Sequence, residues 1–383
     1  MRVRIPAEIS EIIILFFTTR VVLTVIGVVA RALFEPVLAP LRASHRLWWV
    51  YSSGHPVVNI WGVADTEWYL DIARNGYSTT PRFEGQVNLV FFPMYPGFMK
   101  GLGAILGDPF VAGVIISNAA LLVACVLLYR LVRLDEDDQV SLNATKYLLL
   151  FPAAFVLSGV LSESLYLALL LGCFFAARRG RWALAGVLGL LLSLTRVVGV
   201  FAFLPLLYEY YEAVGRNAKN VSRDIFYLLL IPCGLLIFVA YQYALSGDVL
   251  AFVHHAWGTG NSDGKSLWNP LQILLAGLFL RDIRAFVGAI FTLGALAYLF
   301  LHYRQLRFSY WFTALYSIVL PLMGGSLNLY SMPRYLSVVF PLAIILSKVR
   351  SKNPLIDGVT SVVLAILQGG LMVFWTNGAY LPL

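Results

Sequence analysis

Long apolar runs, broken by short polar or basic turns, follow one another along almost the whole chain. A helix that crosses the hydrocarbon core of a bilayer takes about 20 apolar residues, and long apolar runs favour helices over strands. The pattern predicts an all-α polytopic membrane protein with about eleven transmembrane helices. The expected spans lie near residues 10–34, 110–132, 142–160, 162–178, 182–195, 197–213, 225–245, 284–302, 309–325, 333–348 and 355–376.

The composition agrees with a membrane location. Of the 383 residues, 60% are hydrophobic and 13% are charged, whereas soluble domains carry about 25% charged residues. A soluble enzyme and a nucleic-acid-binding protein are therefore excluded. The net charge of +8 comes mainly from basic residues in short turns. It therefore reflects the orientation of the protein in the membrane rather than a nucleic-acid-binding surface.

The basic turns set the expected orientation. The run at 10–34 is too long for the core of a signal peptide, and we interpret it as a retained first span with the N-terminus in the cytoplasm. Five basic clusters then fall on the cytoplasmic side, as the positive-inside rule requires. These clusters are Arg130 with Arg133, Arg178 with Arg179 and Arg181, Arg216 with Lys219 and Arg223, Arg304 with Arg307, and Lys348 with Arg350 and Lys352.

Most of the other polar residues collect on the opposite, outer side. Two long segments, 35–109 and 246–283, and three tight turns near Glu163, Arg196 and Arg334 lie there. A carrier more often places its ionisable residues near the bilayer midplane. The segregation therefore favours an enzyme that works at the membrane surface, and a polytopic carrier stays as the alternative.

The first outer segment contains two short helices. The first is expected over residues 66–75, ends at Gly76 and carries Trp68 and Ile72 on one face, so we expect it to lie on the membrane surface. The second is apolar, begins at two prolines and ends near Leu106. It is too short to span the bilayer, so we expect it to lie at the interface.

Three carboxylates accompany the first of these helices. Asp65 precedes it and is either a helix N-cap or a functional acid, and the two roles are compatible. Glu67 is either a surface carboxylate or a second functional acid. Asp71 has Arg74 three residues later, a spacing that predicts a solvated ion pair.

The same segments resemble the signatures of a known enzyme family. Residues 65–69 read Asp-Thr-Glu-Trp-Tyr, residues 72–77 read Ile-Ala-Arg-Asn-Gly-Tyr, and residues 91–96 read Phe-Phe-Pro-Met-Tyr-Pro. Together they resemble the W-D-x-x-W-Y and F-F-P-x-Y-P motifs of the PIG-V-like mannosyltransferases, prokaryotic relatives of the enzyme that adds the second mannose in GPI-anchor synthesis. Further matches follow in order at residues 162–166, 194–196, 256–258 and 332–335.

The chain departs from the family pattern at two places. Ala64 stands directly before Asp65, where the family has a tryptophan, and Trp61 lies further upstream. Arg196 is followed by Val-Val-Gly, where the eukaryotic members usually carry a polar pair. The departures leave the reaction class intact and leave the acceptor open.

The resemblance implies the GT-C fold in a single integral membrane domain over residues 1–383. Residues 1–245 would form the catalytic transmembrane module with the outer loop 35–109, and residues 246–383 the second outer loop and C-terminal helices. The resemblance also implies a polyprenyl-phosphate sugar as donor and an acidic catalytic residue at the position of Asp65. In an inverting displacement this carboxylate would be the general base, opposite the leaving phosphate. Glu67 is the second catalytic candidate.

Arginines are the candidates for holding the donor phosphate, because their planar fork binds two phosphate oxygens at once. Arg196 and Arg334 lie at the outer ends of spans, where the alternative is that they merely snorkel to the headgroups. Arg20 lies about ten residues into the first span, where a charge requires a partner. It either binds phosphate or pairs with a residue such as Glu163.

The substrate-binding candidates are Glu163, Trp68, Tyr69, Tyr95, His255 and Trp257. Glu163 begins a span, so the alternative for it is an interaction with the helix dipole. The alternative for Trp68 is an interfacial aromatic belt. His255 follows His254 directly and lacks the i, i+4 spacing of paired metal ligands on a helix, so we interpret the pair as substrate or loop contacts. Asp65 and Glu67 alone are too few ligands to argue for a divalent metal ion, and the sequence indicates no other cofactor.

The sequence thus predicts a membrane glycosyltransferase, an inverting mannosyltransferase that moves a sugar from a polyprenyl-phosphate donor to a hydroxyl of a lipid-linked or glycan acceptor. The expected location is the outer face of a prokaryotic cytoplasmic membrane. The expected partners are the donor, the acceptor and membrane lipids, without nucleic acid. A carrier or flippase of lipid-linked sugars is one alternative, and the same fold with another sugar or a protein acceptor is another.

Overall fold

The computed structural model describes residues 6–43, 50–52, 55–83, 86–255, 269–279, 282–323, 326–351 and 353–379. Over these residues the protein is helical, and its β-structure is one isolated bridge between Val50 and Val63. The all-α class expected from the sequence is confirmed.

The α-helices are α1 (Ala7–Ala43), α2 (Pro56–Asn59), α3 (Thr66–Asn75), α4 (Met94–Leu106), α5 (Pro109–Val132), α6 (Asp138–Leu149), α7 (Glu163–Arg178), α8 (Trp182–Ser193), α9 (Phe203–Ala213), α10 (Leu230–Ser246), α11 (Ala251–His254), α12 (Pro270–Phe279), α13 (Ile283–Leu301), α14 (Phe308–Leu322), α15 (Met332–Leu336), α16 (Phe340–Arg350) and α17 (Pro354–Thr376). The 3-10 helices are η1 (Asn88–Val90), η2 (Ala154–Ser158), η3 (Val197–Ala202), η4 (Ala218–Asn220), η5 (Arg223–Leu229), η6 (Tyr303–Gln305) and η7 (Ser326–Ser331).

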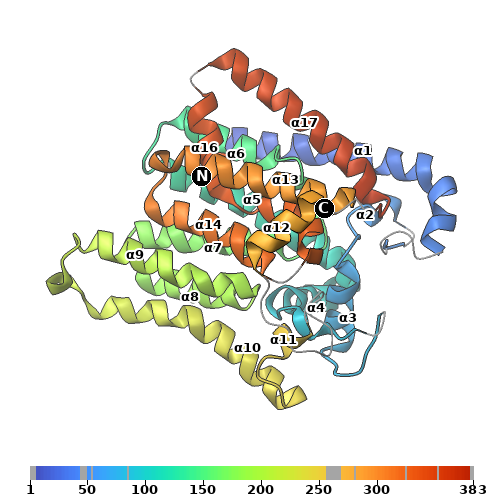
Figure 1. The fold of residues 1–383 in the computed structure, drawn as a ribbon, viewed down its shortest axis with the longest axis horizontal. Helices are drawn as coiled ribbons and strands as arrows, with labels where there is room; N and C mark the ends of the chain where they lie inside the picture. The colour runs from blue at the N-terminus through green and yellow to red at the C-terminus, as the bar shows by residue number, and fades with distance from the viewer. Residues whose placement is uncertain are drawn as a thin grey trace, which may run out of the picture.

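The longer helices lie side by side in one bundle (Figure 1). In that view α17 and α1 run along the top and α10 runs along the bottom, with α5, α7, α8 and α14 between them. The short elements α2, α3, α4 and α11 gather at the right-hand end, far from the turn that joins α9 to α10. One end of the bundle therefore carries most of the irregular structure.

All the expected apolar runs fall on helical segments. In the described part of the chain, 5 helices are long and apolar enough to cross a membrane: α1, α5, η5 with α10, α13 and α17. A sixth forms if the bent pair Asn328–Leu336 and Phe340–Arg350 is counted as one span. Shorter apolar helices pack beside them, so the expected number of spans is roughly consistent with the structure. The protein is an integral multi-pass membrane protein.

Two expected spans are interrupted for identifiable reasons. The run at 142–160 begins as α6, which ends shortly before Pro152, and continues as η2. Proline lacks the backbone N–H and its ring clashes with the preceding turn, so the helix stops there. The run at 333–348 falls on α15 and α16. The helical segments Asn328–Leu336 and Phe340–Arg350 are bent by 53° relative to each other.

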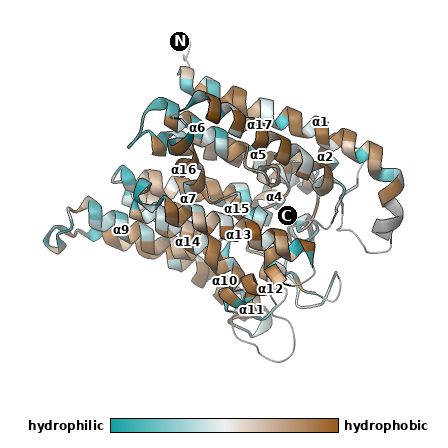
Figure 2. Cartoon of the chain, turned by 45° about the horizontal axis from the view of Figure 1, so that its top comes forward, coloured by the Kyte–Doolittle hydropathy of each residue, from teal (hydrophilic) through white to brown (hydrophobic). Residues whose placement is uncertain are grey.

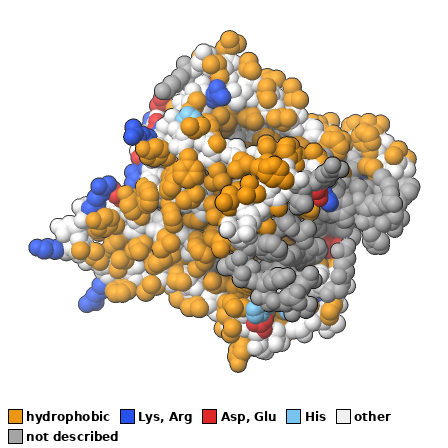
Figure 3. Space-filling model, viewed as in Figure 1, with side chains coloured by type: hydrophobic (Ala, Val, Ile, Leu, Met, Phe, Trp, Pro, Cys, Tyr) orange, Lys and Arg blue, Asp and Glu red, His pale blue; other side chains and the backbone are white. Residues whose placement is uncertain are grey.

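The surface of the bundle is apolar along the helices and polar at its ends. Figure 2 shows hydrophobic residues along the middle of the long helices and hydrophilic residues at the turns. Figure 3 shows the same for one face, with lysine and arginine side chains along its left-hand edge. A belt of this kind is what contact with lipid requires.

Glycines allow close packing between some of the helices. In α13, a Cβ on Gly288 would overlap the backbone carbonyl oxygen of Leu329 in η7, whereas a Cβ on Gly294 in the same helix would meet nothing within 4 Å. Small residues at such contacts let membrane helices approach each other. The two glycines therefore differ in what a methyl group would do.

We expect Gly288→Ala to destabilise the protein and Gly294→Ala to leave it as stable or slightly more stable. Overpacking at Gly288 costs about 1–3 kcal/mol, while alanine in the open position of Gly294 favours the helix by about 1 kcal/mol. Thermal unfolding of the purified variants in detergent measures the difference. Equal melting temperatures would contradict the packing of α13 against η7.

Candidate active site

The beginnings of α3 and α7 are held next to each other by hydrogen bonds in the segments that precede them. The backbone N–H of Val160 donates to the carbonyl oxygen of Trp61 at 3.0 Å. The buried Thr66 hydroxyl donates to the carbonyl oxygens of Val63 at 2.9 Å and Val160 at 3.3 Å. The start of the first outer-loop helix therefore lies beside the start of a core helix.

The turn into α3 is strained. Ala64 has a φ of +58°, in the left-handed region that costs a non-glycine residue about 1–3 kcal/mol. Among the described residues, only Ala64 and Arg216 are non-glycine residues with a positive φ. Such strain often accompanies functional sites, and here it immediately precedes Asp65.

Four charged side chains from four separate segments meet at this point. Arg334 of α15 places its Nη2 atom 2.7 Å from Oδ2 of Asp65 and its Nε atom 3.1 Å from Oε1 of Glu163. Arg196, in the turn between α8 and η3, places Nη1 2.7 Å from the same oxygen of Glu163. Two carboxylates and two guanidinium groups thus form an electrically balanced cluster in which Glu163 joins the two arginines.

The cluster has a buried half and an open edge. The side chain of Glu163 is 1% exposed and that of Arg334 is 7% exposed, whereas Arg196 is 21% and Asp65 is 32% exposed. A buried charge requires a partner because the interior solvates it poorly. The two inner groups therefore hold the cluster together, and Asp65 and Arg196 are its accessible members.

Aromatic and hydroxyl groups complete the site. The Tyr69 hydroxyl lies 2.9 Å from Oγ of Ser162, and Arg196 donates to the same oxygen at 3.4 Å. The guanidinium carbons of Arg196 and Arg334 lie 5.3 Å and 5.2 Å from the centre of the Tyr335 ring. Both arginines are therefore within cation–π distance of one aromatic ring.

The protonation states of the site follow from its burial and its charges. Burial lowers the pKa of Arg196, but Glu163 and Tyr69 raise it by more, so this pKa lies above its ordinary value. Burial and then the charge of Glu163 raise the pKa of Tyr69. At neutral pH, Arg196 is a cation and Tyr69 keeps its proton.

Comparison with known proteins identifies the architecture. A scan against protein-family models and a search of curated proteins find no match. Among solved structures, the chain is similar to ArnT from Cupriavidus metallidurans bound to undecaprenyl phosphate, with a TM-score of 0.52 and 16% identity over 92% of this chain and 62% of that one. The apo form of that ArnT gives a TM-score of 0.52 and 13% identity over 87% of this chain and 62% of that one. ArnT is a GT-C glycosyltransferase.

This chain has the GT-C fold. It spans 62% of the length of the ArnT structures that it matches. The fold that the sequence resemblance implied is therefore confirmed, while membership of the PIG-V-like subfamily stays a prediction.

Within the GT-C fold, Asp65 occupies the N-cap position of α3, but its side chain does not accept a hydrogen bond from that helix. The carboxylate is turned to Arg334 instead. The interpretation of the Asp65 side chain as a helix cap is therefore wrong. Glu67 is half-buried in the first turn of α3, and its catalytic role stays a prediction.

One expectation for α3 is wrong because the helix is packed into the protein. Residues on both of its faces are buried, and Asp71 is only 6% exposed. Asp71 accepts hydrogen bonds from Asn75 and Asn88, both at 2.8 Å, and lies 3.3 Å from Arg82. It is therefore not in a solvated pair with Arg74, while the interfacial location of α3 stays a prediction. Asp71 fastens α3 to the segment that follows it.

Arg20 lies away from the charged cluster. It is 6% exposed and donates to the carbonyl oxygen of Ala154 at 3.2 Å and to the hydroxyl of Ser158 at 3.0 Å. The expected partner Glu163 is engaged by Arg196 and Arg334, so that pairing is wrong. Arg20 instead satisfies backbone and hydroxyl groups where α6 gives way to η2.

Two of the aromatic candidates are packed inside the GT-C fold. Trp68 is 4% exposed, and its ring centre lies 5.0 Å from that of Phe83 and 5.7 Å from that of Phe91. Tyr95 is fully buried and donates to the carbonyl oxygen of Gly113 at 3.0 Å. These contacts stabilise the outer-loop helices, and a role in binding substrate stays a prediction for both residues.

The second outer segment is described only in part. His255 is exposed at the end of α11, and the neighbouring His254 places Nδ1 2.7 Å from Oδ2 of Asp248. Trp257 lies in 256–268, outside the described residues. No group of three or more histidine, cysteine, aspartate or glutamate side chains is arranged to hold a metal ion in the part of the chain that the structure describes.

The sequence did not single out two members of the site. Ser162 bridges Tyr69 and Arg196, and the ring of Tyr335 lies within cation–π distance of both arginines. Each is the immediate neighbour of a charged residue that was singled out. The sequence signal that could have identified Ser162 and Tyr335 is their position next to Glu163 and Arg334.

Proposed function

We propose that this protein is a membrane glycosyltransferase that transfers a sugar from a polyprenyl-phosphate donor to a hydroxyl of a lipid-linked or glycan acceptor, with inversion at the anomeric carbon. The observation that carries the proposal is the partly exposed carboxylate of Asp65, held by Arg334 at the open edge of a buried ionic cluster. The GT-C fold adds the context of a membrane enzyme. An accessible base and an accessible cation at one end of a bundle are what such a transfer requires.

The reaction assigns different tasks to Asp65 and Arg196, the two more accessible members of the cluster. Asp65 accepts the proton of the acceptor hydroxyl as that oxygen forms a bond to C1 of the sugar. The bond between C1 and the phosphate oxygen breaks on the opposite face, and the phosphate leaves with the bonding electron pair. Arg196 stabilises the charge that develops on the phosphate.

The contacts favour Arg196 over Arg334 as the phosphate ligand. Arg334 is committed to both Asp65 and Glu163 and is nearly buried, whereas the described contacts of Arg196 with Glu163 and Ser162 both use Nη1. Arg334 is then a positioning residue that fixes the carboxylate of Asp65. This separates the roles of two arginines that the sequence alone assigned to the same task.

Conservative substitutions distinguish the two arginines. We expect Arg196→Lys to raise the KM for the donor about tenfold, the equivalent of about 1.4 kcal/mol, because lysine cannot bind two phosphate oxygens in a planar fork. Arg334→Lys is expected to lower kcat and leave donor affinity unchanged. Steady-state kinetics and donor-binding measurements on both variants test the assignment, which is wrong if the two variants show the reverse pattern.

The substrates are proposed on two grounds. The similarity to an ArnT structure bound to undecaprenyl phosphate supports a polyprenyl-phosphate lipid as the donor. The resemblance of residues 65–77 and 91–96 to PIG-V-like motifs favours mannose as the sugar. The distribution of the basic turns favours the outer face of the membrane as the location. No metal ion or cofactor is part of the proposed reaction.

A transfer assay with several donors tests the proposal. The protein is reconstituted in vesicles with polyprenyl-phosphate mannose, glucose or aminoarabinose, each radiolabelled in the sugar, and with lipid extracted from the source membrane. Mannosylated lipid formed together with free polyprenyl phosphate is the expected result. Transfer of another sugar alone would overturn the mannosyl assignment. Movement of intact donor across the bilayer without any transfer would establish a carrier instead.

A further inference from the structure

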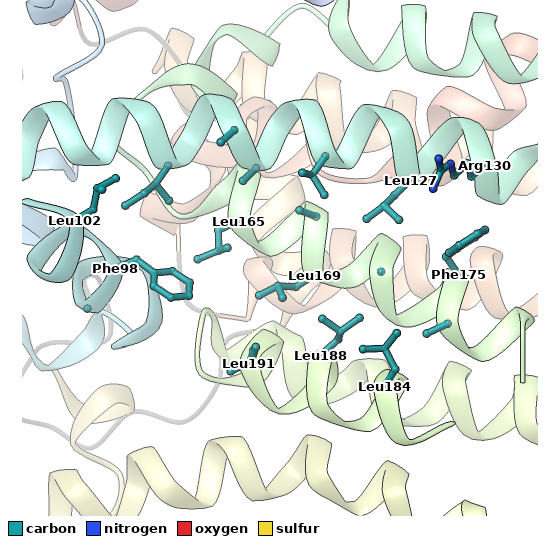
Figure 4. A pocket seen from close by; sticks show the side chains of 18 of the residues that line it. Phe98, Leu102, Leu127, Arg130, Leu165, Leu169, Phe175, Leu184, Leu188 and Leu191 are labelled. Atoms are coloured by element: carbon teal, nitrogen blue, oxygen red, sulfur yellow. The ribbon is translucent and has the colours of Figure 1, made fainter. Parts of the chain in front are cut away.

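An apolar groove runs along the outside of the bundle between α5 and α8, over α7 (Figure 4). It encloses about 1030 Å³, and α4 borders it at the end nearest the charged cluster. Small residues such as Ala168 and Gly172 of α7 form its floor, while Leu127 and Leu188 line its sides. None of the four charged residues of the candidate active site lines it.

Three arginines stand together at the far end of this groove. Arg130 ends the α5 side, and Arg179 and Arg181 lie in the turn between α7 and α8. All three are exposed. Among the described residues none of the three forms an ion pair with a carboxylate, whereas the neighbouring Arg178 is paired with Asp135 at 2.7 Å.

The length of the groove restricts its occupant. The segment of α5 from Ile116 to Arg130 lines it and is about 21 Å long at a rise of 1.5 Å per residue. This is more than the half-thickness of about 15 Å of a hydrocarbon core. The groove is therefore shaped for a long extended hydrocarbon chain rather than for a compact ligand.

We infer that this groove binds an anionic glycerophospholipid, with an acyl chain along α5 and α8 and the phosphate at Arg130, Arg179 and Arg181. Unpaired guanidinium groups at a membrane surface attract anionic headgroups, and their planar forks suit phosphate oxygens. A lipid donor held at Asp65 and Arg196 would place its phosphate at the other end of α7. The charge at the far end of the groove therefore favours a second, separate lipid.

Helix α4 connects the groove to the candidate active site. Phe98 and Leu102 of α4 line the groove. At the beginning of the same helix the backbone N–H of Met94 donates to the carbonyl oxygen of Leu194 at 3.1 Å, two residues before Arg196. An acyl chain that packs against α4 thus stabilises a helix that is hydrogen-bonded to the turn containing Arg196.

Native mass spectrometry of the purified protein tests this inference without any sugar donor. The protein is titrated with phosphatidylglycerol and, separately, with phosphatidylcholine of the same acyl chains. We expect the wild type to prefer phosphatidylglycerol, and the triple variant Arg130→Gln, Arg179→Gln, Arg181→Gln to bind it about tenfold more weakly or worse, since each basic residue near the surface contributes to attraction of anionic lipid.

A second triple variant controls for net charge. Lys219, Arg223 and Arg304 lie in the 3-10 helices η4, η5 and η6, outside the groove, and their replacement by glutamine removes the same charge. We expect these changes to leave phosphatidylglycerol binding unaltered. Equal weakening in both triple variants, or no preference of the wild type for phosphatidylglycerol, would overturn the inference.

A groove-filling variant shows whether a phospholipid acyl chain or the polyprenyl tail of the donor occupies the groove. Ala119 is exposed and lines it, so Ala119→Trp is expected to block the groove while the bundle folds normally. Phosphatidylglycerol binding should fall and polyprenyl-phosphate binding should persist. Loss of polyprenyl-phosphate binding with retained phosphatidylglycerol binding would assign the groove to the tail of the donor and overturn the inference. Binding is measured directly, so its result is independent of the proposed transferase activity.

Discussion

Asp65→Asn is expected to transfer sugar about 10²–10⁴-fold more slowly than the wild type, which is the usual contribution of a positioned general base. Asparagine has nearly the same size as aspartate and still accepts a hydrogen bond from Arg334, but it cannot take up the proton of the acceptor hydroxyl. Donor binding should be unchanged, because the proposed phosphate ligand is Arg196. Single-turnover transfer and equilibrium binding of the donor measure the two effects separately.

Glu67→Gln tests the second candidate for the general base. Glu67 is half-buried in the first turn of the same helix, and the contacts of Arg334 and Arg196 that define the cluster are made to Asp65 and Glu163. We expect Glu67→Gln to retain most of the transfer rate. An active Asp65→Asn together with an inactive Glu67→Gln would move the role of general base to Glu67.

Glu163→Gln is expected to lower both stability and activity. Its carboxylate is 1% exposed and lies within 3.1 Å of both arginines, so its neutralisation leaves two guanidinium groups without their shared counter-charge. Breaking a buried ion pair from one side costs about 3–5 kcal/mol. Thermal unfolding in detergent should show a markedly lower melting temperature, and the folded fraction should transfer sugar poorly because both arginines are displaced.

Glu209→Gln separates stability from activity. Glu209 is also buried, with a side chain 3% exposed, and it lies 3.1 Å from Arg307 and 3.9 Å from Arg178. Arg178 ends α7 and Glu163 begins it, so Glu209 belongs to the opposite end of the bundle. We expect a comparable loss of stability with a normal transfer rate per folded molecule. Equal loss of activity in the two variants would mean that the cluster around Glu163 has only a structural role.

Most of the fold followed from hydrophobic patterning. The apolar runs located the helices, because a backbone inside a bilayer has to satisfy its own hydrogen bonds. Short polar turns located most of their ends, but the span expected at 142–160 ran through Pro152, before which α6 ends. The solvated pair expected between Asp71 and Arg74 was wrong, because Asp71 is buried and accepts a hydrogen bond from Asn88.

The arrangement of the candidate site was harder to predict from the sequence than the fold. The motif resemblance singled out Asp65, Glu163, Arg196 and Arg334, but nothing in the spacing of these residues indicates that Glu163 joins the two arginines. Such pairing depends on how α7, α15 and the turn after α8 pack in three dimensions. The same reason explains why Arg20 was assigned the wrong partner, since a buried arginine is equally satisfied by carbonyl and hydroxyl oxygens.

The configuration of the transferred sugar tests the central claim most directly. The reconstituted wild-type protein is given polyprenyl-phosphate mannose labelled with carbon-13 at C1, and the anomeric configuration of the product is determined by NMR. Direct displacement with Asp65 as general base predicts a product whose configuration at C1 is opposite to that of the donor. A product with the configuration of the donor would indicate two successive displacements and would contradict the role proposed for Asp65.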